Sequence, residues 1–69
     1  MTVFVNRVPL RIFRGAKVGD AILKYSEAVY REILARRKIV TGTEGNPKSL
    51  QDNVDDGDHI DIIRNTQLT

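Results

Sequence analysis

The clearest structural signal in the chain is Val54-Asp55-Asp56-Gly57-Asp58-His59-Ile60-Asp61-Ile62-Ile63. An acidic turn that contains a glycine leads into a run of alternating side chains. Ile60 and Ile62 point to one face of this run, and His59, Asp61 and Ile63 point to the other. In a chain of 69 residues, such a run is best buried in the middle of a sheet. We therefore expect the other elements to be arranged around this last strand.

Two strands are expected at the start of the chain. Residues 2–6 and residues 10–13 each alternate in character, which is typical of half-buried strands. Residues 6–9, with the sequence Asn-Arg-Val-Pro, supply turn-forming types between them, so we predict a β-hairpin. Pro9 has no N–H group for a strand ladder, and the second strand should therefore lie at the sheet edge.

A helical pattern begins at Val18, because apolar residues recur from there at three- and four-residue steps as far as Ile33. Basic residues at 36–38 crowd the last turn, as the helix dipole prefers. Ser26 is a candidate internal cap. The sequence therefore leaves open whether residues 18–36 form one helix or two shorter ones.

The middle of the chain adds a short strand candidate at residues 38–41 and a loop at residues 42–47. A right-handed crossover then places the last strand parallel to the first, with the helix across one face. We predict one α+β domain over residues 1–69, with a flexible tail at 65–69. Its mixed sheet should have about four or five strands, with one main helix packed across one face.

Three segments of this chain match a known pattern: Val3-Phe4-Val5-Asn6, Gly15-Ala16-Lys17-Val18-Gly19-Asp20-Ala21-Ile22-Leu23 and Asp56-Gly57-Asp58-His59-Ile60-Asp61-Ile62-Ile63. With them the chain resembles the ubiquitin-like β-grasp proteins. The likeness is greatest to the sulfur carrier proteins of thiamine and molybdopterin synthesis. TGS domains, found in some RNA-associated enzymes and GTPases, are a second likeness. These motifs specify turns and a sheet, and they imply a fold rather than a chemistry.

The chain departs from the sulfur carriers in three ways. Those proteins end in Gly-Gly, and their terminal carboxylate is adenylated and converted to a thiocarboxylate. Here no glycine follows Gly57, so we do not assign that chemistry to Thr69. Lys17 stands where the family usually has threonine, which removes a helix N-cap. Residues 30–38 form a long basic stretch.

Composition excludes several classes of site. The chain has no cysteine, so disulfides, thiolate metal sites and cysteine-ligated iron–sulfur clusters are excluded. No apolar run approaches the ~20 residues that span a bilayer, and residues 1–6 are too short for a signal peptide. We therefore expect a soluble, cytoplasmic protein that does not bind membranes.

The charges are unevenly distributed. Ten Lys and Arg residues face four acidic residues up to Lys48, whereas Arg64 faces five Asp residues from Ser49 onward. Three outcomes stay open: the two parts of the chain pair with each other, a basic face binds an anionic partner, or the charges form a solvated surface.

Three patterns that resemble catalytic or metal sites have simpler interpretations. Residues 42–49 nearly match a P-loop, but Pro47 replaces the second glycine and removes a phosphate-binding N–H. The run Asp52–Asp61 lacks the ligand types of a calcium loop. His59 is the only histidine. It could act as a base only with a serine nucleophile such as Ser26 or Ser49, and nothing in the sequence orients either pair. We therefore predict no catalytic residues, no metal and no cofactor.

The best candidate site is the sheet face away from the helix. Alternation predicts that this face carries Phe4, Arg11, Phe13, Asp61 and Ile63 on three neighbouring strands. An uncovered patch of two phenylalanines and an isoleucine, with charged residues around it, is typical of a contact site. Long arginine side chains lying across the patch are the alternative.

These observations favour a non-catalytic protein that acts as a protein-binding module or accessory subunit through its open sheet face. The resemblance implies an E1-like or biosynthetic enzyme as the partner. One alternative is a sulfur carrier in thiamine or molybdopterin synthesis with a variant tail. A second is a TGS-like RNA-binding module, supported by the basic first part of the chain and by rings that stack on bases. A homodimer through a sheet edge or an uncovered face also stays open.

Overall fold

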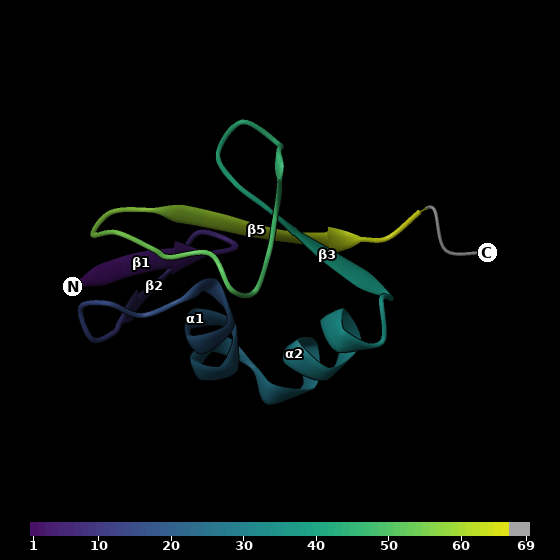
Figure 1. Ribbon diagram of the computed structural model, residues 1–69, viewed down its shortest axis with the longest axis horizontal. Helices are drawn as coiled ribbons and strands as arrows, with labels where there is room; N and C mark the ends of the chain where they lie inside the picture. Colours follow the sequence, from purple (N-terminus) through teal and green to yellow (C-terminus); the bar gives the residue numbers. More distant parts are fainter. Residues whose placement is uncertain (67–69) are drawn as a thin grey trace.

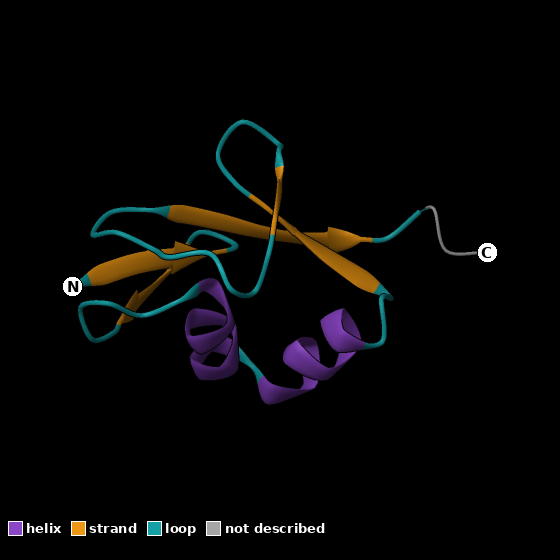
Figure 2. Ribbon diagram, viewed as in Figure 1, coloured by secondary structure: helices purple, strands orange, loops and turns teal. Residues whose placement is uncertain are grey.

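The computed structural model describes residues 1–66, which form a five-stranded mixed sheet with both helices on one of its faces (Figure 1, Figure 2). The elements in chain order are β1 (Thr2–Val5), β2 (Val8–Arg11), α1 (Val18–Tyr25), α2 (Glu27–Leu34), β3 (Lys38–Thr41), β4 (Pro47–Lys48) and β5 (His59–Arg64). The strands lie side by side in the order β2-β1-β5-β3-β4. The predicted α+β class and mixed sheet are confirmed.

β5 lies in the middle of the sheet, as its alternating sequence predicts. It pairs in parallel with β1 and antiparallel with β3. Ile60 is buried in one cluster with Val3 and Val5 of β1 and with Ile22 of α1. Since these side chains come from opposite ends of the chain, the core forms only when the two ends meet.

β1 and β2 form the predicted hairpin, but its turn is shorter than the sequence indicates. Val5 faces Val8 across the pair, so Asn6 and Arg7 alone make the turn, with φ angles of 51° and 69°. Positive φ at both central residues is the type I′ turn, whose twist matches that of the flanking strands. Pro9 therefore lies within β2, at the sheet edge as predicted.

Replacing Arg7 with glycine is expected to stabilise the domain. A residue other than glycine pays about 1–2 kcal/mol for a left-handed conformation, whereas glycine gains about 0.5–1 kcal/mol of freedom in the unfolded chain. Arg7 is exposed, so no packing is lost. We expect the free energy of unfolding to rise by about 0.5–1 kcal/mol in a denaturant titration. An unchanged or lower value would contradict the assigned turn.

The helical region contains two helices, and the prediction of one main helix differs from the structure. Ser26 has extended backbone angles (φ −166°, ψ 120°), which end α1. Its hydroxyl oxygen accepts a hydrogen bond from the Val29 N–H at 3.2 Å and caps α2. A serine cap competes with helix continuation through this local bond. Within residues 1–66, neither helix has the length and apolar composition needed to cross a bilayer.

The end of β5 is attached to the end of α2. The Asn65 N–H donates to the Arg37 carbonyl oxygen at 3.0 Å, and the Asn65 side-chain amide donates to the Arg36 carbonyl oxygen at 2.8 Å. Asn65, which the sequence assigns to a flexible tail, therefore belongs to the folded domain. Residues 67–69 of that tail lie outside the described residues.

Candidate protein-binding site

The face of the sheet away from the helices is called the open face below. Strand alternation and the pairing registers define its residues. They are Thr2 and Phe4 of β1, Pro9 and Arg11 of β2, His59, Asp61 and Ile63 of β5, Ile39 and Thr41 of β3, and Pro47 of β4. Four of the five residues predicted for this face, Phe4, Arg11, Asp61 and Ile63, lie on its strands.

An aromatic pair forms the first apolar part of the open face. Phe4 and His59 are neighbours across β1 and β5, and their rings stack with centroids 4.5 Å apart and planes 7° from parallel. His59 is exposed and Phe4 is half-buried. Stacked rings on neighbouring strands stabilise the pairing and present a flat surface to a partner. The sequence predicts His59 on this face but gives no sign of the stack.

An isoleucine pair forms the second apolar part. Ile39 of β3 lies directly opposite Ile63 of β5, and 46 % of the surface of Ile63 is exposed. Sequence reasoning did not include Ile39 in the site. The signal that could have found it is alternation within residues 38–41, once that segment is known to pair with β5.

A carboxylate lies between the two apolar pairs. Asp61 is half-buried on β5 and faces Thr41, which is 6 % exposed. Among residues 1–66, the ion pairs are Arg31 with Glu27 and Lys38 with Glu32, so Asp61 has no cationic partner there. The centre of the open face can therefore receive a positively charged group.

Phe13 does not join this surface. Arg11 pairs with Thr2, so Phe13, two residues later, lies beyond the start of β1. His59 pairs with Phe4, so Ile63, four residues later, lies beyond the end of β1. At ~3.3 Å per residue, the two side chains are separated by about 26 Å along the strands. Phe13 is 62 % exposed, at the far end of the sheet. Phe13 and Ile63 of the predicted patch therefore lie far apart along the strands, because alternation gives the face but not the position along it.

The P-loop-like segment is a β3–β4 loop. The Gly42 N–H donates to the Asn46 carbonyl oxygen, and the Gly45 N–H donates to the Gly42 carbonyl oxygen. Pro47 and Lys48 form β4, so a strand stands where a P-loop would begin a helix. The loop N–H groups close a turn, and the resemblance to a P-loop has no structural basis.

Three of the five acidic residues in the last third of the chain accept hydrogen bonds from backbone N–H groups. The carboxylates of Asp52, Asp56 and Asp58 accept from the N–H groups of Ser49, Thr2 and Asp55. No group of three His, Cys, Asp or Glu residues within residues 1–66 could hold a metal ion. These carboxylates order turns, and among the described residues none forms an ion pair with the basic part of the chain.

The two serines weighed as nucleophiles have structural roles. Ser26 caps α2, as described above, and the Ser49 hydroxyl oxygen accepts a hydrogen bond from the Gln51 N–H at 3.1 Å. His59 is occupied by its stack on Phe4. The structure thus brings together an apolar and acidic face, and it does not assemble a nucleophile with a base from these residues.

Comparison with protein-family models, with curated proteins and with solved structures finds no match.

Proposed function

We propose that this chain is a non-catalytic β-grasp domain that binds a partner protein through the open face. The strand order β2-β1-β5-β3-β4, with a parallel central pair and the helices between β2 and β3, supports the β-grasp assignment. In this proposal the domain acts as a binding module or accessory subunit, and an E1-like or biosynthetic enzyme is the partner class that the sequence resemblance implies.

One observation carries the proposal. The Phe4–His59 and Ile39–Ile63 pairs flank Asp61, a half-buried carboxylate without a cationic partner among residues 1–66. Binding sites on proteins commonly combine an apolar centre with a few polar groups that fix orientation. The partner that complements this arrangement is a folded protein with an apolar patch and a Lys or Arg side chain placed to pair with Asp61.

Nucleic acid complements the open face less well. Single strands bind proteins through a basic groove and several aromatic rings on which successive bases stack. Here one stacked pair lies beside a carboxylate that repels phosphate, and Phe13 is at the other end of the sheet. A protein surface is therefore the occupant that we propose.

Site-specific photo-crosslinking tests where the partner binds. A photo-reactive amino acid at position 63 is expected to crosslink a partner protein in cells that express the chain. The same group at position 13, also exposed but about 26 Å from Ile63 along the strands, is the matched control and should capture no such partner. Crosslinking to a second copy of this chain would replace the proposal with a homodimer.

Affinity measurements with the purified partner test the mechanism. Ile63→Asp is expected to weaken binding by about tenfold or more, because it places a charge where the interface buries an apolar side chain. Asp61→Lys should weaken it by a similar factor through repulsion of the partner's cation. Phe13→Asp should leave the affinity unchanged. Equal affinities of Ile63→Asp and the unmodified chain would overturn the proposal.

A further inference from the structure

A groove lies at one edge of the sheet, between α2 and the β3–β4 strands. It has a volume of about 290 Å³, and its apolar wall is formed by Ile33 of α2, Ile39 and Val40 of β3, Pro47 of β4 and Leu50 of the following loop. β4 pairs only with Val40 and Thr41. The first half of β3 therefore has no strand neighbour on this side among the described residues, and the groove follows that free edge.

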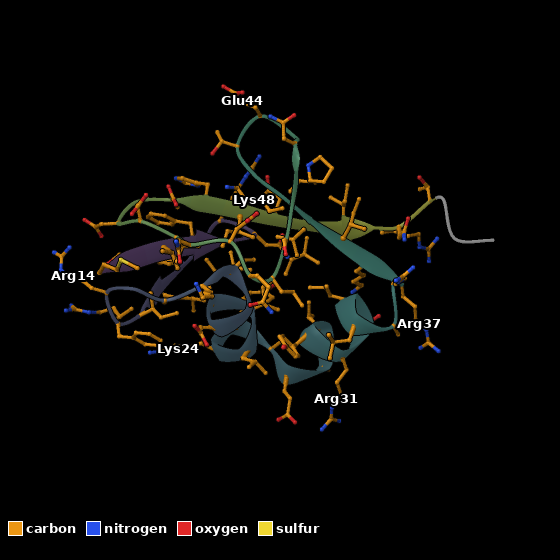
Figure 3. All side chains as sticks on the ribbon, viewed as in Figure 1. Arg14, Lys24, Arg31, Arg37, Glu44 and Lys48 are labelled. Atoms are coloured by element: carbon orange, nitrogen blue, oxygen red, sulfur yellow. The ribbon has the colours of Figure 1, made fainter. Side chains whose placement is uncertain are left out.

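Basic side chains border the groove. Arg36, Lys38 and Lys48 contribute to its lining. A second hollow of about 390 Å³ also includes Lys38 and extends the basic surface to Arg37 and Arg64. Figure 3 shows Arg37 projecting from the end of the molecule where β3 begins.

The charges of this border are poorly neutralised by the protein itself. Lys38 lies directly opposite Arg64 on the paired strands, and like charges in that position repel each other. Glu32 pairs with Lys38 at 3.2 Å. Within residues 1–66, Arg36, Arg37 and Arg64 form no ion pair. Three cations thus stand at one end of an apolar groove without a carboxylate partner in the described part of the chain.

The backbone holds Arg36 in a conformation that favours glycine. Arg36 has a φ angle of 63° directly after α2. Its N–H donates to the Ile33 carbonyl oxygen, and the Arg37 N–H donates to the Glu32 carbonyl oxygen. This is the Schellman motif, in which glycine is the usual residue at the position that Arg36 occupies. The arginine is therefore present despite a conformational cost, and the attachment of Asn65 fixes its neighbours in place.

We propose that this groove binds an acidic peptide segment of a partner protein. One apolar side chain of the peptide enters the groove between Ile33, Val40 and Leu50, and the neighbouring Asp or Glu side chains pair with Arg36, Arg37 and Arg64. Guanidinium groups bind carboxylates in a two-point geometry. The lining has no aromatic ring on which a base could stack, so a peptide complements the groove better than nucleic acid does. The groove shares Ile39 and Pro47 with the edge of the open face, but its lining includes none of Phe4, His59, Asp61 and Ile63.

A binding titration with defined peptides tests the proposal. The probe is a fluorescein-labelled synthetic peptide with a Leu-Leu pair flanked on both sides by Asp and Glu. One control peptide replaces the leucines with serine, and a second probe is a single-stranded RNA of equal charge. Fluorescence anisotropy should show saturable binding of the first peptide. The protein should bind the leucine peptide about tenfold more tightly than the serine peptide, because the leucine side chains bury apolar surface in the groove.

Protein variants locate the site. Arg64→Glu is expected to weaken binding of the acidic peptide by about tenfold or more. Arg14→Glu, the same change at the opposite end of the molecule (Figure 3), is the matched control and should leave it unchanged. Arg36→Gly is expected to weaken binding while raising the melting temperature, because it removes a cation and relieves the backbone. This variant separates a loss of binding from a loss of folding.

Three results would overturn the proposal. They are the absence of saturable binding, equal affinity of the leucine and serine peptides, and tighter binding of the RNA than of the acidic peptide. Phe4→Ala, on the open face and outside the lining of the groove, should bind the peptide normally, so failure of this site and failure of the proposed function can be told apart.

Discussion

Replacing Ile60 with alanine is expected to lower the free energy of unfolding by about 3 kcal/mol, because it leaves a cavity in the core. Ile60 is 1 % exposed and lies in the central strand, next to Val5 of β1. At roughly 0.05–0.15 kcal/mol per residue, a domain of this size is stable by about 3–10 kcal/mol. This single change should therefore remove a large part of the total stability, and some of the protein should be unfolded at physiological temperature.

Urea unfolding followed by circular dichroism measures this effect. Ile63→Ala is the matched control, since it makes the same change three residues further along β5, on the opposite face of the strand. Because Ile63 is 46 % exposed, its truncation should cost less than about 1 kcal/mol. Equal losses from the two variants would mean that Ile60 does not lie in the core.

Replacing Asn6 with alanine is expected to lower the free energy of unfolding by about 1–3 kcal/mol, for two separable reasons. Asn6 has a φ angle of 51°, which asparagine tolerates better than alanine. Its side-chain oxygen also accepts a hydrogen bond from the Ile62 N–H at 2.9 Å. This bond continues the pairing of β1 with β5 beyond the last residue of β1.

Two further variants separate these contributions. Asn6→Gly keeps the positive φ and loses the acceptor, whereas Asn6→Asp keeps both an acceptor and a side chain that tolerates this conformation. The expected order of stability is Asp above Gly above Ala. Amide hydrogen exchange at Ile62 should be faster in the glycine variant than in the aspartate variant. Equal exchange in these two variants would show that the side-chain oxygen does not protect the Ile62 N–H.

The sheet could be predicted from the sequence because its central strands have a clear two-residue period. Val3, Val5 and Ile60 were placed in the core by this period alone, and each is buried. The hairpin turn was harder to predict, since Asn6 and Arg7 form a type I′ turn without the glycine that usually marks one. The division of the helical region at Ser26 depends on a cap, which sequence reasoning raised but could not decide.

The open face could be predicted only in part. Alternation correctly assigns Phe4, Asp61 and Ile63 to one side of the sheet. It contains no information about how far each strand is shifted against its neighbour, and this shift separates Phe13 from Ile63. Ile39 was missed for a related reason, because a four-residue strand has too short a pattern to show which strand it pairs with.

The basic border of the groove could not be predicted from the order of charges along the chain. The sequence shows basic residues at 36–38 and a single Arg64 in the acidic last part. The antiparallel register of β3 and β5 places Lys38 opposite Arg64 and so joins the two. Charge totals for the parts of the chain before and after Ser49 group Arg64 with the acidic residues, although in the fold it lies beside the basic ones.

Both outer strands of the sheet carry a proline, Pro9 in β2 and Pro47 in β4. The partner of Pro9 is Phe4, whose N–H donates to the Asp58 carbonyl oxygen on the side of β5. In an antiparallel pair the backbone groups of Pro9 then point outward. The Ile62 N–H points toward Asn6 on the β1 side, so the backbone groups of the preceding residue, Asp61, point toward its partner Thr41 in β3. The backbone groups of Thr41 point back toward β5, and those of its other partner, Pro47, therefore point outward. At each edge of the sheet, the proline thus leaves one outward position without an N–H donor for a further strand. This disfavours edge-to-edge association of sheets. If two copies associate, they should therefore make contact through the faces of their sheets and not by pairing their edge strands into one continuous sheet.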